Sequence, residues 1–248
     1  MMLGWWGEAL AVALGLVLGS YAVTASLRLA RRQPSTLGRS HCDACGASLS
    51  FADTVPVVSY VGLRGACASC GARIDPLHVA GELAGAVVLA GAAALRAPVS
   101  GALAAALGLC LLATAAVDIK IRRLPNAFAA AVALLGAILA LRRSLEDLLI
   151  GGGFALGLGA ALQGLRVVRQ RLGQDPGLGF GDVKLIAAAS LWLGVAAPWM
   201  LLVAALVGLL AMVIVRPADH RLAFGPAIAV ATWTVGMIVE LGLWPRAI

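Results

Sequence analysis

Residues 3–32 read LGWWGEALAVALGLVLGSYAVTASLRLARR, a mostly apolar run in which Glu8 is the only charged residue before Arg28. About 20 apolar helical residues cross a bilayer core about 30 Å thick, and this run exceeds that length. Arg28, Arg31 and Arg32 then mark its inner end. A cleavable secretory signal starts with a basic region, which this run lacks. The stretch therefore predicts a membrane anchor.

The whole chain has the composition of a membrane protein. Of its 248 residues, 61% are hydrophobic and 12% are charged, and the mean hydropathy is +0.96. Soluble domains contain about 25% charged residues. After a polar stretch from Arg28 to Pro76, further apolar segments follow at 78–95, 99–117, 127–141, 148–165, 183–197, 198–215 and 223–244. We therefore predict an all-α polytopic membrane protein with about eight transmembrane helices, embedded in a lipid bilayer.

The Lys and Arg residues indicate the orientation, because they concentrate in cytoplasmic loops. With the N-terminus outside, all of them lie on the inner side except Arg96, Arg142, Arg143 and Arg246. We therefore expect a multi-pass membrane protein with its N-terminus outside. Basic loops beside membrane helices also account for the net charge of +7, so we predict no nucleic-acid partner.

Four of the five cysteines form two pairs, Cys42-Asp-Ala-Cys45 and Cys67-Ala-Ser-Cys70. Two residues between thiolates let one turn present both sulfurs to a tetrahedral ion, and two such turns complete a closed zinc site. We predict structural Zn²⁺ held by all four, with a small sheet spanning the two pairs. Two disulfides or unligated cysteines are the alternatives, and a reducing cytoplasm disfavours disulfides. Cys110 is alone in an apolar segment, where packing explains it.

These features divide the chain into three predicted parts. Residues 1–27 form the first transmembrane helix, 28–77 a cytoplasmic zinc-binding domain with four cysteines, and 78–248 a multi-helix membrane domain. The middle part has few large apolar groups and can barely build its own core. Metal binding would therefore contribute much of its folding free energy.

Two aspartates stand at the ends of apolar segments. Asp118 ends the third segment and Asp182 opens the sixth, so both are expected at the cytoplasmic edge of the membrane. Taken singly, each is explained as a helix cap or an interfacial charge. Two neighbouring carboxylates instead share a proton, so one can activate water while the other protonates a peptide. Gly179 and Gly181 allow a close approach of the backbone before Asp182.

Three glutamates also lie in or beside apolar spans. Glu8 and Glu240 fall near the outer ends of their segments. Glu82 enters the second segment from the cytoplasmic side and is expected to support either the site or the packing.

The chain resembles the prepilin leader peptidase family, also called type IV prepilin peptidases. The resemblance is carried by Asp118 with Leu124-Pro125-Asn126, and by the GxGD run Gly179-Phe180-Gly181-Asp182-Val183-Lys184-Leu185. The cysteine segment from Arg39 to Gly71 and the run Phe224-Gly225-Pro226 are similar to the family as well. The resemblance implies an intramembrane aspartyl protease that uses Asp118 and Asp182 to cleave the leader of type IV prepilins or pseudopilins at the cytoplasmic face.

The resemblance also implies a second activity. Family members with this cysteine loop methylate the new N-terminus with S-adenosylmethionine, for which the sequence assigns no binding residue. After Gly19-Ser20 the family usually carries Phe-Leu-Asn, whereas this chain has Tyr21-Ala22-Val23. A peptidase without methyltransferase activity is therefore an alternative.

Two alternative hypotheses assign the same residues to other classes of protein. A proton-coupled transporter would place paired broken helices in duplicated halves, which this sequence does not show. A zinc-stabilised assembly scaffold would leave the placement of Asp118 and Asp182 unexplained.

Overall fold

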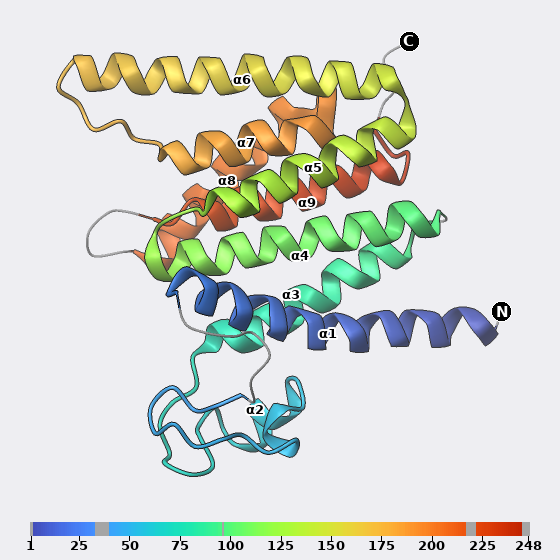
Figure 1. Ribbon diagram of the computed structural model, residues 1–248, viewed down its shortest axis with the longest axis vertical. Helices are drawn as coiled ribbons and strands as arrows, with labels where there is room; N and C mark the ends of the chain where they lie inside the picture. The colour runs from blue at the N-terminus through green and yellow to red at the C-terminus, as the bar shows by residue number, and fades with distance from the viewer. Residues whose placement is uncertain (1, 33–39, 96, 217–221, 245–248) are drawn as a thin grey trace.

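The computed structural model describes residues 2–32, 40–95, 97–216 and 222–244 (Figure 1). Arg39, Arg96, Arg221 and Arg246, which the sequence argument used, lie outside the described residues. The helices are α1 (Met2–Ala30), η1 (Ala52–Thr54), α2 (Val58–Gly62), α3 (Pro76–Ala93), α4 (Pro98–Ile121), α5 (Asn126–Arg143), α6 (Leu145–Arg171), α7 (Phe180–Leu193), η2 (Gly194–Ala196), α8 (Ala197–Val215) and α9 (Gly225–Glu240).

The predicted all-α membrane architecture is confirmed. Within the described residues, six helical stretches are long and apolar enough to cross a membrane, and they include every long helix except α9, which is apolar but shorter. The last stretch, Phe180–Val215, comprises α7, η2 and α8, whose joint interrupts a single apolar run. Gly194 has a φ of 53° at the end of α7, and a proline stands in the first turn of α8. Both features end one helix and start another.

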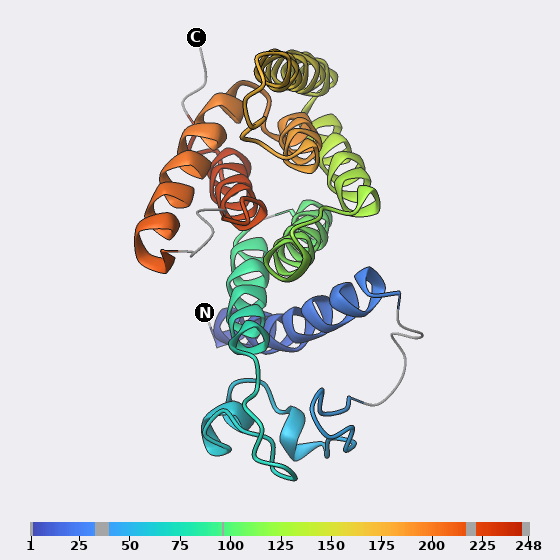
Figure 2. The same cartoon turned by 90° about the vertical axis from the view of Figure 1, so that its left-hand side faces the viewer.

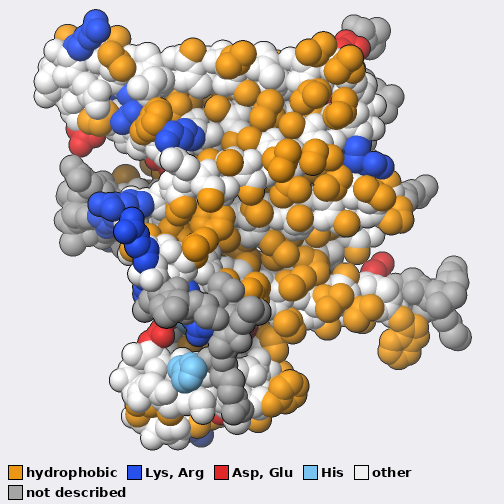
Figure 3. All heavy atoms as spheres, viewed as in Figure 1, with side chains coloured by type: hydrophobic (Ala, Val, Ile, Leu, Met, Phe, Trp, Pro, Cys, Tyr) orange, Lys and Arg blue, Asp and Glu red, His pale blue; other side chains and the backbone are white. Residues whose placement is uncertain are grey.

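The long helices run side by side, and the cysteine segment projects from one end of them below α1 and α3 (Figure 1). α4 lies in the middle, in contact with α1, α3, α5 and α9. In the turned view, α9 and α5 lie on the two sides of α4, α8 lies outside α9, and α7 and α6 lie above (Figure 2). Hydrophobic side chains cover the flanks of the helices, while Lys and Arg gather mainly at the end that bears the cysteine segment (Figure 3). We call this end the cysteine end.

The core is built around Trp192 near the end of α7, whose side chain is fully buried. A Cβ atom at Gly236 on α9 would lie 2.2 Å from its indole ring, and one at Gly136 on α5 would lie 3.1 Å from its Cβ. The two glycines therefore make room for the tryptophan. This tight packing fixes α7 between α5 and α9.

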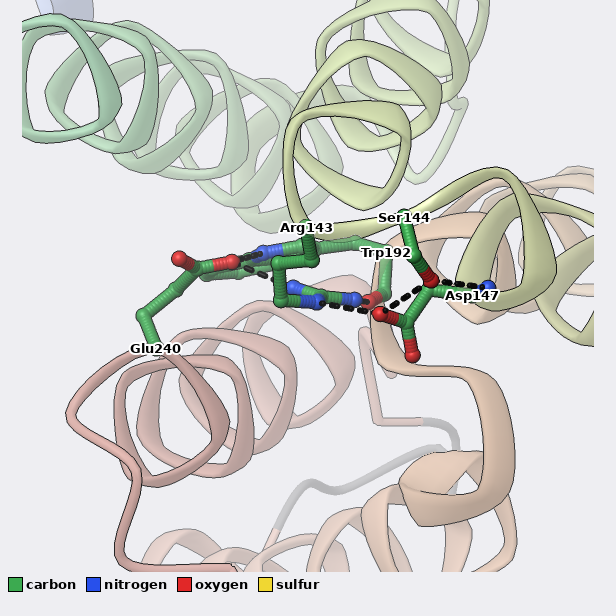
Figure 4. A network of polar contacts seen from close by, with 5 residues as sticks. All are labelled: Arg143, Ser144, Asp147, Trp192 and Glu240. Atoms are coloured by element: carbon green, nitrogen blue, oxygen red, sulfur yellow. Dashed lines mark hydrogen bonds and ion pairs between the residues drawn. The ribbon is translucent and has the colours of Figure 1, made fainter.

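The end opposite the cysteine segment is held by a buried ion pair (Figure 4). Arg143 of α5 pairs with Glu240 of α9, whose side chain is only 7% exposed. Arg143 also donates to the backbone carbonyl of Trp192 at 2.6 Å, and the Trp192 indole donates to Glu240 at 2.9 Å. Asp147 of α6 lies 3.7 Å from the same guanidinium. The network ties α5, α6, α7 and α9 together, and accounts for Glu240 without a catalytic role.

Four glycines let α1 and α3 cross at backbone contact. Gly15 and Gly19 face Gly81 and Gly85, so each helix presents a pair of glycines four residues apart. A Cβ at Gly19 would lie 2.2 Å from the carbonyl oxygen of Gly81. Small residues at this spacing favour helix association in membranes because they let the backbones pack closely. The hydrophobic effect does not drive this association, since lipid tails are as apolar as the helix surfaces.

Substitution of Gly85 by valine should therefore force α1 and α3 apart. The new Cβ would lie 2.2 Å from the Gly15 carbonyl oxygen, and backbone cannot yield as a flexible side chain can. Overpacking of this kind costs about 3 kcal/mol, so we expect a clear fall in the Tm of the purified protein in detergent. Gly157→Val is the matched control, since nothing lies within 4 Å of a Cβ at Gly157. Equal Tm losses in both variants would contradict the proposed contact.

Candidate active site and metal centre

Asp118 and Asp182 come from different helices and lie at the same end of the molecule, the cysteine end. Asp118 is in the last turn of α4, and Asp182 is in the first turn of α7. Asp118 is 6% exposed and Asp182 is half-buried. Leu124, six residues after Asp118, lies against Gly181, the residue before Asp182, so the two carboxylates lie in the same region. Neighbouring carboxylates that are partly shielded from water share one proton more easily than both ionise.

A residue to which sequence reasoning gave no role holds Asp118. The backbone N–H of Gly225, at the start of α9, donates to the Asp118 carboxylate at 2.7 Å. A Cβ at Gly225 would lie 2.8 Å from that carboxylate oxygen, so no larger residue fits without displacing it. Gly225 belongs to the run Phe224-Gly225-Pro226 noted above, but only the fold shows that this run reaches α4.

The first turn of α7 is fixed against the connection between α4 and α5. A Cβ at Gly181 would lie 2.8 Å from the Leu124 Cβ, so the glycine permits this contact. Lys184 donates to the Asn126 side-chain oxygen at 2.8 Å. Asp182 is the third residue of α7 and accepts the backbone N–H of Gly179, the N-cap residue, at 3.0 Å; it is therefore not the N-cap residue itself, which one interpretation of the sequence expected. Three runs that are distant in the sequence therefore meet around the two carboxylates.

Arg166 of α6 fixes the segment that leads into α7. Its guanidinium donates to the Leu178 carbonyl at 2.7 Å and lies 5.5 Å from the centre of the Phe180 ring. Lys184 lies 4.2 Å from the same ring centre. A cation is attracted to the face of an aromatic ring. The two cations therefore hold the Phe180 ring in place although this side chain is half exposed.

The four predicted zinc ligands converge. The Sγ atoms of Cys42, Cys45, Cys67 and Cys70 all lie within 4.8 Å of one another, and Cys42 and Cys70 are 3.9 Å apart. Zn–S bonds of about 2.3 Å in a tetrahedron place sulfurs about 3.8 Å apart. The cluster therefore fits a metal ion, and the cysteines are not joined by disulfides. Cys110 lies outside it, on α4.

Both cysteine pairs adopt the same turn. Gly46 donates to the Cys42 carbonyl and Gly71 to the Cys67 carbonyl, each at 2.9 Å, with φ values of 71° and 69°. This left-handed conformation favours glycine. The predicted small sheet is reduced, within the described residues, to isolated antiparallel bridges that close each turn, His41 with Ser48 and Ala66 with Arg73.

The thiols of the cluster do not ionise equally in the metal-free protein. Backbone N–H groups of Cys45 and Ala44 lower the pKa of the Cys42 thiol to about 7. The backbone N–H of Ala72 lowers the pKa of the Cys70 thiol. The hydrogen bonds between Cys70 and the other thiols have the larger, opposite effect and raise this pKa to about 11. One thiol therefore ionises readily, whereas further thiolates beside it would repel one another. A cation in the centre of the cluster would remove this repulsion, so the remaining thiols would lose their protons when it binds.

A pocket of about 410 Å³ lies between the cysteine segment and the membrane helices α1, α3 and α4. Its lining carries both charge signs and an aromatic ring, with Arg28, Arg31 and Arg73 as basic groups, Asp53, Asp75 and Glu82 among the acidic ones, and Tyr60. Lys120, two residues after Asp118, also lines it. The volume is in the range of small-molecule sites.

Glu82 joins the pocket to the fold. It accepts the Ser20 hydroxyl at 3.1 Å and the Val57 backbone N–H at 2.8 Å, and is 9% exposed. Val57 has a φ of 62°, a conformation that is costly for a β-branched residue. Glu82 therefore holds a strained turn of the cysteine segment against α1 and α3, and serves both packing and the pocket.

Asp75 and Lys120 form an ion pair at the edge of the pocket, between the start of α3 and the end of α4. Asp75 also caps α3 by accepting the Leu77 N–H at 3.0 Å. Burial raises the pKa of Asp75, but the Lys120 ammonium and the Leu77 N–H together bring it below its usual value. Asp75 is therefore ionised at neutral pH.

Comparisons with known proteins agree with these motifs. Residues 13–96 match the bacterial peptidase A24 N-terminal domain, and residues 105–215 match the type IV leader peptidase family. A prepilin leader peptidase/N-methyltransferase of Burkholderia pseudomallei is 34% identical over 81% of this chain and 74% of its own length. Proteins of the same name from Bacillus subtilis (33% identical, 87% of this chain, 88% of its own length) and Neisseria gonorrhoeae (34%, 79% and 70%) are similar too. No solved structure matches significantly.

Proposed function

Because the chain belongs to the type IV leader peptidase family, we propose that it cleaves the leader peptide of type IV prepilins or pseudopilins and methylates the new N-terminus. It is an endopeptidase and a multi-pass protein of the bacterial inner membrane. Its N-terminus lies outside, and the domain of residues 28–77 and both aspartates lie at the cytoplasmic face. Arg28, Lys120, Arg169 and Arg171 at the cysteine end support this orientation.

The catalytic pair is Asp118 and Asp182. The observation that carries this assignment is the meeting of α4, α7 and α9 around two carboxylates, with Gly225 donating to one of them. The substrate's apolar stem lies among the helices of the 78–248 domain and its leader stays at the cytoplasmic face. Water is the nucleophile, one aspartate takes its proton, and the other protonates the leaving amine. No covalent intermediate is formed.

Substitution of Gly225 by alanine should disturb this pair without removing an ionisable group. The added Cβ would lie 2.8 Å from an Asp118 oxygen and 3.0 Å from its Cβ, so the carboxylate must move. A misplacement of about 1 Å costs about 100-fold in rate. We therefore expect about a 100-fold loss of prepilin cleavage in membranes at normal protein level. Gly164→Ala, where the Cβ meets nothing within 4 Å, is the control. Full activity of the Gly225 variant would argue against the contact.

Zinc is the metal that suits the cysteine cluster. Four thiolates at tetrahedral spacing form a closed structural site, which leaves no position for a substrate. Cys42, Cys45, Cys67 and Cys70 would hold the ion and keep the domain of residues 28–77 folded against α1 and α3. The metal has no part in peptide cleavage.

The pocket between this domain and the membrane helices fits S-adenosylmethionine. The donor carries a carboxylate, an ammonium, a sulfonium and an adenine ring, and the pocket offers groups for each: Arg28 for the carboxylate, the buried Glu82 for positive charge and Tyr60 for the ring. When bound, it would supply an electrophilic methyl group to the neutral amine of the product. The protein's part is to orient donor and amine.

The test is the reaction itself. Purified enzyme in detergent is incubated with a prepilin of known sequence, with and without S-adenosylmethionine, and the product N-terminus is read by mass spectrometry. We expect leader removal in both samples and the mass of one methyl group only when the donor is present. Absence of cleavage would refute the peptidase assignment. Cleavage without methylation would leave the peptidase-only alternative.

A further inference from the structure

The last turn of α4 carries one residue from each of the two sites. Asp118 faces α9, where Gly225 donates to it, while Lys120 lines the pocket and pairs with Asp75, the N-cap residue of α3. Residues two apart on an α-helix point in directions that differ by about 200°. The peptidase pair and the pocket therefore lie on opposite faces of the same helical turn.

The separation between the two sites is about one helix width. An α-helix with its side chains is about 10–12 Å across, and three or four residues of extended chain cover that distance at about 3.3 Å each. α4 ends at Ile121, one residue after Lys120, and Arg122 turns the chain with a φ of 50°. Ile121, Arg122 and Arg123 are exposed at this end, so a peptide end can pass over the end of the helix instead of through the protein.

We infer that the product's new N-terminus passes around the end of α4 into the pocket before the product leaves the enzyme, guided by the Asp75–Lys120 ion pair. This inference rests on the proposed function, since it joins its two activities. Cleavage and methylation then form one processive sequence at a single enzyme molecule. The apolar stem of the product remains among the helices while only its first few residues move.

Charge favours this movement. An α-amine has a pKa of about 7.7–8.0, so the freshly cut N-terminus is mostly cationic at neutral pH. Asp75, ionised at the edge of the pocket, attracts it by exchanging Lys120 for the incoming ammonium. The side chains of Lys120 and Asp75 are 31% and 35% exposed, so the ion pair contributes little to stability and can open without unfolding. Asp75 and Lys120 are thus positioning residues, not catalytic ones.

The inference is tested by competition between two products. Full-length enzyme in proteoliposomes receives isotopically heavy prepilin, S-adenosylmethionine and a 100-fold excess of light product that is already cleaved and unmethylated. If the N-terminus passes directly, early methylation marks heavy product at least 10-fold above its share of the pool. Methylation that follows the pool composition would overturn the inference while leaving both activities intact. Absence of methyl on either product would refute the proposed methyltransferase itself.

Variants then test whether the Asp75–Lys120 ion pair guides the N-terminus around the end of α4. In Asp75→Asn the heavy-product enrichment should fall by at least 5-fold relative to the cleavage rate, and Asp75→Glu should restore it because the carboxylate that attracts the ammonium is kept. Arg123→Met is the matched control, an exposed basic residue at the same end that is not among the pocket's lining residues. A merely structural role would lower cleavage and methylation together and keep the enrichment. Unchanged enrichment in Asp75→Asn would remove the ion pair from the inference.

Discussion

Replacing Asp118 or Asp182 by asparagine should abolish prepilin cleavage while leaving the fold intact. Asparagine keeps the shape of the side chain, and its oxygen can still accept the Gly225 or Gly179 N–H. It cannot take up or release a proton at working pH, so general acid–base catalysis is lost, an effect of about 10²- to 10⁴-fold. The cleavage rate of each variant is measured on purified protein with a defined prepilin.

The two carboxylates should behave as one unit. The double variant is therefore expected to be no slower than either single variant, since residues that act together give non-additive losses. Asp147→Asn is the control, because Asp147 lies at the opposite end of the molecule and belongs to the Arg143 network. Cleavage at the wild-type rate by either single variant would refute the proposed mechanism.

Loss of the metal should abolish methylation, whereas the aspartate variants above should abolish cleavage. Structural zinc contributes about 10–16 kcal/mol of apparent binding free energy in zinc-finger peptides. Replacement of the buried Cys67 by serine should remove the ion and unfold the domain of residues 28–77. Because Cys42 and Cys67 also line the pocket, methylation should fall below detection. Cleavage should persist at a reduced rate, since both aspartates are on membrane helices.

Zinc content per chain and the product mass measure this prediction together. Cys110→Ser is the matched control, because Cys110 lies on α4 outside the cluster. Its zinc content and methylation should equal those of the wild type. A Cys67 variant that keeps one zinc ion per chain and still methylates would contradict the assignment of the cluster.

Patterns that are local in the chain were readable before the structure. The membrane helices follow from apolar runs of sufficient length, since the bilayer satisfies no backbone hydrogen bonds. The boundary between the predicted segments 183–197 and 198–215 was less distinct in the sequence, because no charged residue marks it; in the structure α7 ends at Gly194 and a proline stands in the first turn of α8. The clustering of the four cysteines, too, follows from two short turns of known geometry. The sequence identifies Glu82 as a carboxylate in an apolar segment. It does not predict that Glu82 binds the Val57 N–H, because Val57 lies on a separate segment.

The sequence by itself determined the fold class, the family motifs and the residue types that carry the chemistry. Only the tertiary structure decided what these residues touch: Gly225 against Asp118, Lys184 against Asn126, and Lys120 at the pocket. The physical reason is that helix periodicity and turn chemistry act over a few residues, whereas these contacts join segments far apart in the chain. Their distances depend on how glycines such as Gly85 and Gly181 let whole helices approach, and only the packed molecule specifies that approach.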